Sequence, residues 1–102
     1  REFSAFGGAT IDAPDVDVDT SQVGPGYGQA TPESVAAVRL VAGAEGILLD
    51  PIYTGKAMAA VIERIRTGRI APGSRLLFVH TGGSLNLFTY AKAFNEHARS
   101  TD

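Results

Sequence analysis

The fold of this chain is decided by the stretch Ile47-Leu48-Leu49-Asp50-Pro51-Ile52-Tyr53-Thr54-Gly55-Lys56. Its first three residues are wholly apolar, which suits a parallel strand that is buried on both faces. A second stretch has the same order, because the strand-like run Arg75–Val79 is followed by His80-Thr81-Gly82-Gly83. Open α/β sheets bind ligands at the carboxyl ends of their strands. Both stretches are therefore predicted to contribute to one binding site.

Helical segments are predicted on either side of these strands. The first covers about 32–44, with Thr31 as its N-cap and Gly46 as its stop. Apolar spacing predicts two more helices, over 54–66 and over about 84–98. The order α-β-α-β-α from residue 31 indicates an α/β fold, with helices packed on a short parallel sheet.

The N-terminal part differs in composition from the rest. Residues 1–23 hold Gly7-Gly8, Pro14 and the acidic alternation Asp15–Asp19, and are predicted to be a loop-rich extension with one short edge strand around 16–18. Residues 24–102 are predicted to form one partial α/β domain. Because two or three strands leave open apolar edges, we expect a piece of a larger domain that is marginal, oligomeric or aggregation-prone when alone. The start at Arg1, without an initiator methionine, fits a cut chain.

Composition excludes several classes of function. The formal net charge is −2 and the pI is about 5.6, so nothing favours nucleic acid or an anionic membrane as partner. There is no cysteine, and the two histidines show no metal-ligand spacing, so no metal site is expected. No apolar run approaches the roughly 20 residues that span a bilayer. A cytoplasmic location is the default expectation.

Three motifs together resemble a known family. They are Gly26-Tyr27-Gly28, the stretch from Glu45 to Met58, and the stretch from Leu77 to Gly83 with Leu87-Phe88 beyond it. In this order and spacing they resemble the C-terminal part of the D-cysteine desulfhydrase and 1-aminocyclopropane-1-carboxylate deaminase group. That group consists of pyridoxal-phosphate enzymes of the tryptophan-synthase-β fold type (fold type II). The resemblance covers about residues 24–90.

The resemblance implies roles for particular residues. Tyr53 aligns with a tyrosine that contacts substrate at the cofactor and assists proton transfer or nucleophilic opening, and Tyr27 aligns with a second active-site tyrosine beside it. Thr81 aligns with the residue that faces the pyridine nitrogen, with Gly82 and Thr54 as further cofactor-binding positions. Hydrogen bonding within a tyrosine pair is expected to lower the pKa of one phenol. A neutral threonine at the pyridine nitrogen leaves a weaker electron sink than a carboxylate, which suits β-elimination.

Simpler interpretations stand beside these roles. Tyr53 could be an ordinary packing residue, Tyr27 a loop aromatic, and Thr81 a helix cap. Gly82-Gly83 could be only a tight turn. We expect the remaining candidates to be structural: His80 as a hydrogen-bonded residue at a strand end, Lys56 as a surface or structural residue, and Tyr90 as part of the core or of an interface.

Two departures favour the desulfhydrase branch of this group. The deaminases have a glutamate directly after the motif tyrosine, where this chain has Thr54, and they lack the threonine that is present here as Thr81. The resemblance also implies a Schiff-base lysine and a phosphate-binding glycine-rich loop, and neither motif occurs in these 102 residues. The lysines are Lys56 and Lys92, and neither has the matching context.

The sequence thus predicts the C-terminal part of a lyase that carries out α,β-elimination, giving pyruvate, ammonia and a sulfur leaving group. The expected partners are a small amino-acid substrate and either further copies of the chain or the N-terminal part of the same enzyme. We expect neither stable binding of pyridoxal 5'-phosphate nor turnover by this chain alone. The alternatives are a non-catalytic α/β oligomerisation module, a 1-aminocyclopropane-1-carboxylate deaminase fragment, and a nucleotide-binding fragment that uses Thr81-Gly82-Gly83.

Overall fold

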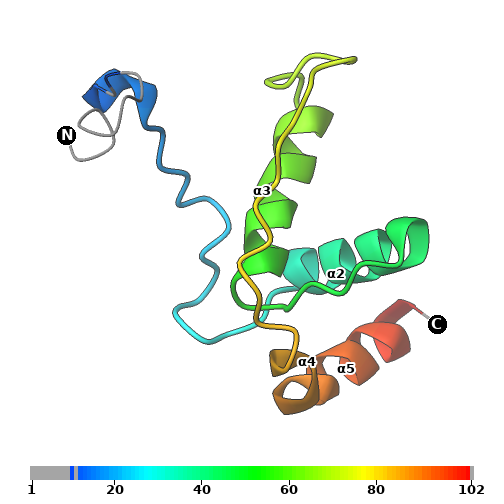
Figure 1. Cartoon of the computed structure of the whole chain (residues 1–102). Helices are drawn as coiled ribbons and strands as arrows, with labels where there is room; N and C mark the ends of the chain where they lie inside the picture. The colour runs from blue at the N-terminus through cyan, green and yellow to red at the C-terminus, as the bar shows by residue number, and fades with distance from the viewer. Residues whose placement is uncertain (1–9, 11, 102) are drawn as a thin grey trace.

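The computed structural model describes residues 10 and 12–101 of the chain, with side chains described as far as Glu96. The elements are a short 3-10 helix η1 (Ala13–Asp15) and the helices α2 (Pro32–Glu45), α3 (Thr54–Arg66), α4 (Asn86–Thr89) and α5 (Ala91–Thr101). The first turns of α2 and α3 meet near the centre, α5 lies beside α2 with α4 next to the start of α5, and the segment that carries η1 extends away to one side (Figure 1). None of the helices in this described part has the length and apolar character needed to cross a membrane.

Helix α2 begins and ends as its sequence predicts. The Thr31 hydroxyl accepts a hydrogen bond from the Ser34 amide at 3.0 Å, and the Ser34 hydroxyl oxygen accepts one from the Thr31 amide at 3.0 Å. This reciprocal cap satisfies two amides, and Pro32 occupies the first turn, where no amide donor is required. Gly46 ends the helix in the left-handed region at φ 66°. The predicted N-cap and stop are both confirmed.

Helix α3 has the predicted bounds, from Thr54 to Arg66. The amide of Thr67 closes its last turn on the carbonyl of Glu63 at 3.0 Å, and Gly68 follows with a φ of +78°. A turn over 71–74 follows, with the Ser74 amide donating to the Ala71 carbonyl at 3.2 Å.

The core lies where α2 meets α3 and the residues that precede α3. Gly55, in the first turn of α3, allows this close approach, since a Cβ there would lie 3.0 Å from Val38 Cγ2 and 3.2 Å from the Ser34 carbonyl oxygen. Helix α5 joins α2 through the Arg39 guanidinium, which donates to the Phe94 carbonyl at 2.7 Å and lies 5.6 Å from the centre of the Phe94 ring. The buried apolar side chains are Val35, Ala37, Val38, Leu49, Ile52 and Ala59.

The predicted strands do not pair with one another. Segments 16–18, 47–49 and 75–79 have no ladder partner, and the described residues contain no strand. The last two segments still meet at one end, where the His80 imidazole lies 2.8 Å from the Leu48 carbonyl and the Ser84 hydroxyl donates to that carbonyl at 3.2 Å. A strand exists only through hydrogen bonds to a neighbouring strand, so the apolar sequence of these segments was not enough to predict that they form strands here. The predicted parallel sheet is therefore not formed within the described part of the chain.

The predicted helix over 84–98 is wrong in one respect, because it is broken at Tyr90. Helix α4 ends there with φ −106° and ψ 20°, and α5 begins at Ala91. The Tyr90 hydroxyl lies close to Gly28, 3.6 Å from where a Cβ would stand on that residue. A contact to a distant loop thus accompanies the break, and apolar periodicity carries no information on such a contact.

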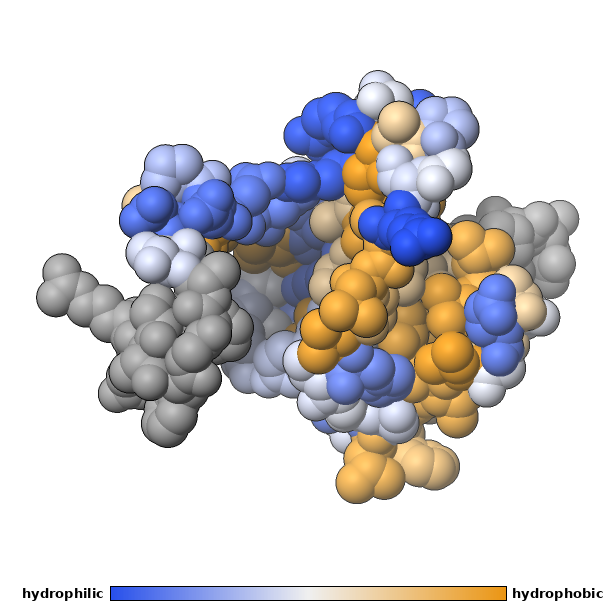
Figure 2. All heavy atoms as spheres, turned by 45° about the horizontal axis from the view of Figure 1, so that its top comes forward, coloured by the Kyte–Doolittle hydropathy of each residue, from blue (hydrophilic) through white to orange (hydrophobic). Residues whose placement is uncertain are grey.

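Apolar side chains remain exposed over much of the surface. The radius of gyration is 15.8 Å, compared with about 13 Å for a compact domain of 100 residues. The space-filling view shows apolar atoms gathered on one face (Figure 2). The exposed large apolar residues of the extended segments include Ile47, Leu48, Leu76, Leu77 and Val79, with Leu77 92% exposed. Such surface is typical of elements that are covered in a larger structure.

Candidate functional site

The loop before α3 is organised by the carboxylate of Asp50, which is fully buried. Its Oδ2 accepts hydrogen bonds from the amides of Ile52 at 2.8 Å and Tyr53 at 2.7 Å. Its Oδ1 accepts from the Thr54 amide at 2.9 Å and from the Thr54 hydroxyl at 2.7 Å. Four donors thus converge on one side chain, which satisfies the first amides of α3 and places a negative charge at the positive end of the helix.

These contacts determine the ionisation of Asp50. Burial is the largest single influence and raises its pKa, but the hydrogen bonds from Tyr53, Thr54 and Ile52 together outweigh burial and lower the pKa below the ordinary value of 3.8. The carboxylate is therefore charged at neutral pH. Sequence reasoning gave Asp50 no role of its own, although an aspartate followed by proline and a hydroxyl residue at the start of a helix is a local signal for such a turn.

Thr54 is 2% exposed, and both functions of its hydroxyl are used within this turn. The hydroxyl donates to Asp50 Oδ1 and accepts from the Asp50 amide at 2.8 Å. In this arrangement Thr54 maintains the turn, and its side chain does not lie at the open side of the site.

The structure brings Tyr27 and Tyr53 together. Tyr53 is the N-cap residue of α3, Tyr27 lies in the Gly26–Gly28 loop, and their hydroxyl groups form a very short hydrogen bond. The ring centroids are 6.2 Å apart with an interplanar angle of 61°, which is an edge-to-face arrangement. Tyr53 is 49% exposed and Tyr27 82% exposed, so both phenols are accessible from solvent.

The pKa of Tyr53 is raised above 10.0, whereas the sequence predicts a lowered pKa for one phenol of the pair and does not say which. The hydrogen bond with Tyr27 is the main cause, followed by partial burial and by the charges that Tyr27, Tyr90 and Asp50 carry when ionised. The hydrogen bond between the two phenols stabilises the neutral form of Tyr53, so the predicted lowering does not fall on this residue. Tyr53 is thus protonated at neutral pH.

Tyr90 is the third tyrosine near this site, and sequence reasoning assigned it only to a core or an interface. Its hydroxyl lies near Gly28, next to Tyr27, and its charge when ionised affects Tyr53. All three tyrosines of the chain therefore converge from the Gly26–Gly28 loop, the start of α3 and the α4–α5 break. Only a tertiary structure reveals this convergence.

The His80–Gly83 motif forms a tight turn beside Asp50. The Gly82 amide donates to His80 Nδ1 at 3.0 Å, while His80 Nε2 lies 2.8 Å from the Leu48 carbonyl, which is the pattern of a neutral imidazole with its proton on Nε2. The hydrogen-bonded role predicted for His80 is confirmed, although the segment before it is not a strand. Thr81 is exposed, and Gly82, with a φ of +95°, has open space beside its Cα.

Lys56 extends from α3 to the loop that carries Tyr27. Its Nζ donates to the Val23 carbonyl at 2.8 Å and to the Gly26 carbonyl at 3.4 Å. The structural role expected for Lys56 is thereby confirmed.

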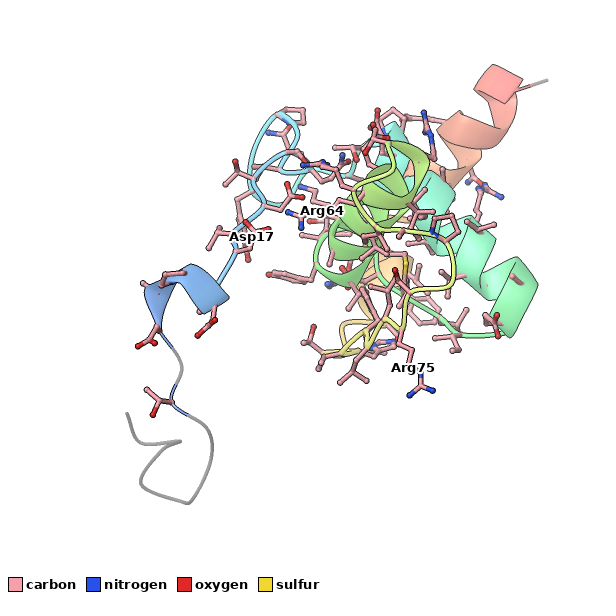
Figure 3. The ribbon with its side chains drawn as sticks, turned by 90° about the horizontal axis from the view of Figure 1, so that it is seen from above. Asp17, Arg64 and Arg75 are labelled. Atoms are coloured by element: carbon pink, nitrogen blue, oxygen red, sulfur yellow. The ribbon has the colours of Figure 1, made fainter. Side chains whose placement is uncertain are left out.

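An ion-pair cluster holds the N-terminal segment against α3. Arg64 Nη2 lies 2.9 Å from Asp17 Oδ2, and Arg64 Nε lies 3.0 Å from Asp19 Oδ2. Figure 3 shows Arg64 pointing toward Asp17, whereas Arg75 points away from the molecule. Hydrogen bonds from Ser21, and then from Arg64, lower the pKa of Asp19 to about 2. The segment that leads to Tyr27 is thus attached to α3 at a second place.

Comparison with known proteins gives a consistent result. The profile of the family described as "Pyridoxal-phosphate dependent enzyme" matches residues 5–82. A 1-aminocyclopropane-1-carboxylate deaminase of Burkholderia ambifaria (strain MC40-6) is 44% identical over 87 residues, which cover 85% of this chain and 26% of that protein. A D-cysteine desulfhydrase of Klebsiella pneumoniae (strain 342) is 56% identical over 66 residues, which cover 65% of this chain and 20% of that protein.

The chain spans about a quarter of the length of the curated relatives it matches. The family match begins at residue 5, upstream of residue 24, where the resemblance in the motifs begins. These comparisons confirm the resemblance that the three motifs carry.

Proposed function

The chain belongs to the family of pyridoxal-phosphate dependent enzymes, and on this basis we propose that it is the C-terminal part of a D-cysteine desulfhydrase-like lyase. The parent reaction is α,β-elimination from a cysteine-type amino acid, giving pyruvate, ammonia and a sulfur leaving group. Membership of this family supports the α/β class. In the proposed parent domain, segments 47–49 and 75–79 become strands of a parallel sheet whose other strands come from elsewhere in the enzyme, in agreement with their exposed apolar residues.

The observation that carries this proposal is the hydrogen-bonded pair of Tyr27 and Tyr53. Both phenols are exposed, and the Asp50 carboxylate that accepts from the Tyr53 amide also lies against Gly83, in the turn that holds Thr81. A phenol with a raised pKa keeps its proton at neutral pH and can give it to a group that becomes basic during the reaction. In the proposed reaction Tyr53 gives its proton to the departing sulfur, and Tyr27 orients the Tyr53 hydroxyl.

The residues present fit one part of pyridoxal phosphate. The exposed Thr81 hydroxyl and the open space beside Gly82 suit the ring-nitrogen side of the cofactor. When bound, the cofactor supplies an electron-accepting ring that stabilises negative charge at the α-carbon of the substrate. Thr81 would face the ring nitrogen as a neutral partner, and Gly82 would allow close approach of the backbone. We assign Thr54 a supporting role, in which it holds the Asp50 turn that positions Tyr53.

The covalent anchor and the phosphate site of the cofactor have no counterpart on these residues. The Lys56 ammonium group already donates to two carbonyls at the Tyr27 loop. We therefore propose that this chain alone neither retains pyridoxal phosphate nor turns over substrate, and that it needs the remainder of the enzyme. A cytoplasmic location belongs to the same proposal.

The runner-up within the family is a 1-aminocyclopropane-1-carboxylate deaminase. The longer match to the Burkholderia protein, 44% over 87 residues, favours it. Thr54 and Thr81 stand against it, because the resemblance links both residues to the desulfhydrase branch. The higher local identity to the Klebsiella protein, 56% over 66 residues, supports the same choice.

A candidate of a different class is a non-catalytic oligomerisation module. The exposed apolar residues on segment 75–79, with Leu77 92% exposed, favour it, because such a surface drives association. It differs from the lyase proposal in requiring no chemistry from Tyr53.

A chimera tests these candidates. This chain replaces the aligned C-terminal part of the Klebsiella D-cysteine desulfhydrase, and the purified protein is assayed for pyruvate and sulfide from D-cysteine and for ammonia from 1-aminocyclopropane-1-carboxylate. We expect elimination from D-cysteine. Ammonia from the cyclopropane substrate without sulfide from D-cysteine would establish the runner-up. A folded chimera that binds cofactor but is inactive on both would favour the non-catalytic module.

The isolated chain provides the complementary test. After addition of pyridoxal phosphate and removal of the excess by gel filtration, we expect no cofactor absorbance to remain with the protein. Retained absorbance together with pyruvate production would show that the chain is an autonomous enzyme and would overturn its assignment as an incomplete part.

A further inference from the structure

Lys56 and Tyr53 reach the same loop from the same helix start. Tyr53 immediately precedes α3, and Lys56 is the third residue of that helix. The phenol of Tyr53 bonds to Tyr27, and the ammonium group of Lys56 donates to the carbonyls of Val23 and Gly26. The first turn of α3 therefore holds the loop by a side-chain contact and by two backbone contacts.

The contacts of Lys56 with the loop backbone lie close to Tyr27, which is the loop residue that the proposed site requires. Gly26 is bonded covalently to Tyr27, so the location of the Gly26 carbonyl fixes where the Tyr27 side chain begins. The loop itself offers little rigidity, because Gly24 and Gly28 adopt φ values of +73° and +74° and glycine favours many conformations. One internal backbone bond, from the Gln29 amide to the Gly26 carbonyl, is 3.3 Å long. An external restraint is needed to hold Tyr27 in one place.

A lysine suits this task physically. Three N–H donors on one flexible stem can bond to carbonyls that point toward a common position, and a charged donor makes stronger hydrogen bonds than a neutral one. Arg64 holds the same segment further upstream, at Asp17 and Asp19. Those two contacts are ten and eight residues before Tyr27 and leave the glycine-rich part of the loop unrestrained. Lys56 supplies the restraint close to the phenol.

We propose that Lys56 is a positioning residue of the site, which fixes the Tyr27 loop so that the Tyr27 hydroxyl meets that of Tyr53. The geometric part of this inference concerns the chain itself, whereas its consequence for catalysis rests on the proposed lyase function. Removal of the ammonium group releases the two carbonyls, and the Tyr27 ring then samples positions away from Tyr53.

The test is an NMR measurement on the full chain at neutral pH. Cross-relaxation between the ring protons of Tyr27 and Tyr53 reports their proximity, and the Tyr27→Phe and Tyr53→Phe variants assign the signals. The variants compared are Lys56→Met, which keeps the apolar stem, Lys56→Arg, which restores charged donors, and Lys92→Met, which removes an exposed lysine on α5. Far-UV circular dichroism shows whether each variant keeps its helices.

We expect the Tyr27–Tyr53 cross-peak to be lost in Lys56→Met and to be retained in Lys56→Arg and Lys92→Met, with helix content unchanged. A cross-peak of unchanged intensity in folded Lys56→Met would overturn the proposal. If Lys56→Met does not fold, Lys56→Gln takes its place, since it keeps much of the stem and one neutral donor group. Loss of the Tyr27–Tyr53 cross-peak in folded Lys56→Gln would support the positioning role of the Lys56 ammonium group. Retention of the cross-peak in that variant would contradict this role.

The same substitutions in the chimera measure the catalytic consequence. Lys56→Met is expected to lower kcat about 10- to 100-fold with a smaller change in KM, because displacement of a positioned group by about 1 Å has effects of this order. If the chimera has no lyase activity, the proposed function fails while the cross-peak still decides the positioning role. If the chimera is active and the cross-peak is insensitive to Lys56, only the positioning role fails.

Discussion

Gly83 lies against the carboxylate of Asp50, so closely that a Cβ on Gly83 would stand 2.9 Å from Oδ1 and 3.1 Å from Cγ. The side chain that caps α3 is thus also in contact with the His80–Gly83 turn. This contact joins the two motifs that the sequence places about thirty residues apart. Any substitution at either residue is expected to affect both.

Gly83→Ala is expected to lower the free energy of unfolding by about 1 to 3 kcal/mol, because the added methyl group meets a buried carboxylate. Gly82→Ala is the matched control, since Gly82 has a similarly positive φ of +95° but open space beside it. Urea unfolding, monitored by circular dichroism, measures the free energy of unfolding of both variants. Equal losses would show that only backbone conformation matters and that the Asp50 contact is unimportant.

Asp50→Ala is expected to reduce stability by about 2 to 4 kcal/mol, because several buried amides lose a charged acceptor. The lowered pKa of Asp50 sets the pH dependence: its contribution is present above the ordinary value of 3.8 and is lost as pH falls through the lower value of the folded state. Unfolding midpoints measured from pH 6 downward should therefore converge for the wild-type chain and Asp50→Ala in acid. A constant difference between them at all pH values would contradict this account.

Gly55→Ala and Gly43→Ala should change the free energy of unfolding in opposite directions, although both glycines lie in helices. Alanine at position 43 meets nothing within 4 Å and is expected to stabilise α2 by about 0.5 to 1 kcal/mol. Alanine at position 55 would collide with the Asp50 carbonyl and with Val38, so a loss of about 1 to 3 kcal/mol is expected. Thermal and urea unfolding measure the stability of both variants. Stabilisation by Gly55→Ala would refute the close approach of the two helices.

The raised pKa of Tyr53 predicts an alkaline dependence. Its hydrogen bond with Tyr27 contributes stability that is fully present below 10.0 and is lost as pH rises through the higher pKa of the folded state. Spectrophotometric titration of tyrosinate should show one late-titrating phenol in the wild-type chain. In Tyr27→Phe this phenol should titrate closer to 10.0, whereas an unaltered curve would remove the main cause given for the shift.

Tyr53→Phe in the chimera is expected to lower kcat for elimination by about 10²- to 10⁴-fold, the usual contribution of a proton-transferring side chain. The substitution keeps the ring and removes only the hydroxyl, so cofactor absorbance should stay the same and the unfolding midpoint should fall only by the contribution of the lost hydrogen bond to Tyr27. Phe88→Tyr, on the exposed surface of α4, is a control for a change of one hydroxyl elsewhere. Full activity in Tyr53→Phe would refute the role proposed for this phenol.

The features that depend on neighbouring residues could be predicted from the sequence. The N-cap at Thr31, the stop at Gly46 and the bounds of α3 follow from hydrogen bonds and backbone preferences within a few residues. The strands at 47–49 and 75–79 could not be established in this way, because a ladder requires a partner that is distant in sequence. The described residues supply none.

The site shows the same division between local and distant information. Motif order led to Tyr27 and Tyr53, but the direction of the pKa shift at Tyr53 depends on the hydrogen bond between the two phenols and on the groups around them, which only the arrangement in space shows. The convergence of Tyr90 on this site and the contact between Asp50 and Gly83 likewise join residues that no local pattern connects.

Lys56 recognises the Tyr27 loop through main-chain carbonyls and not through side chains. Every amino acid offers the same carbonyl group, so this contact places little restriction on which side chain stands at position 23. What it does restrict is the spacing between positions 23 and 27, because one inserted or deleted residue would move the Tyr27 phenol relative to the two anchored carbonyls. Homologous loops are thus expected to vary more readily in composition than in length.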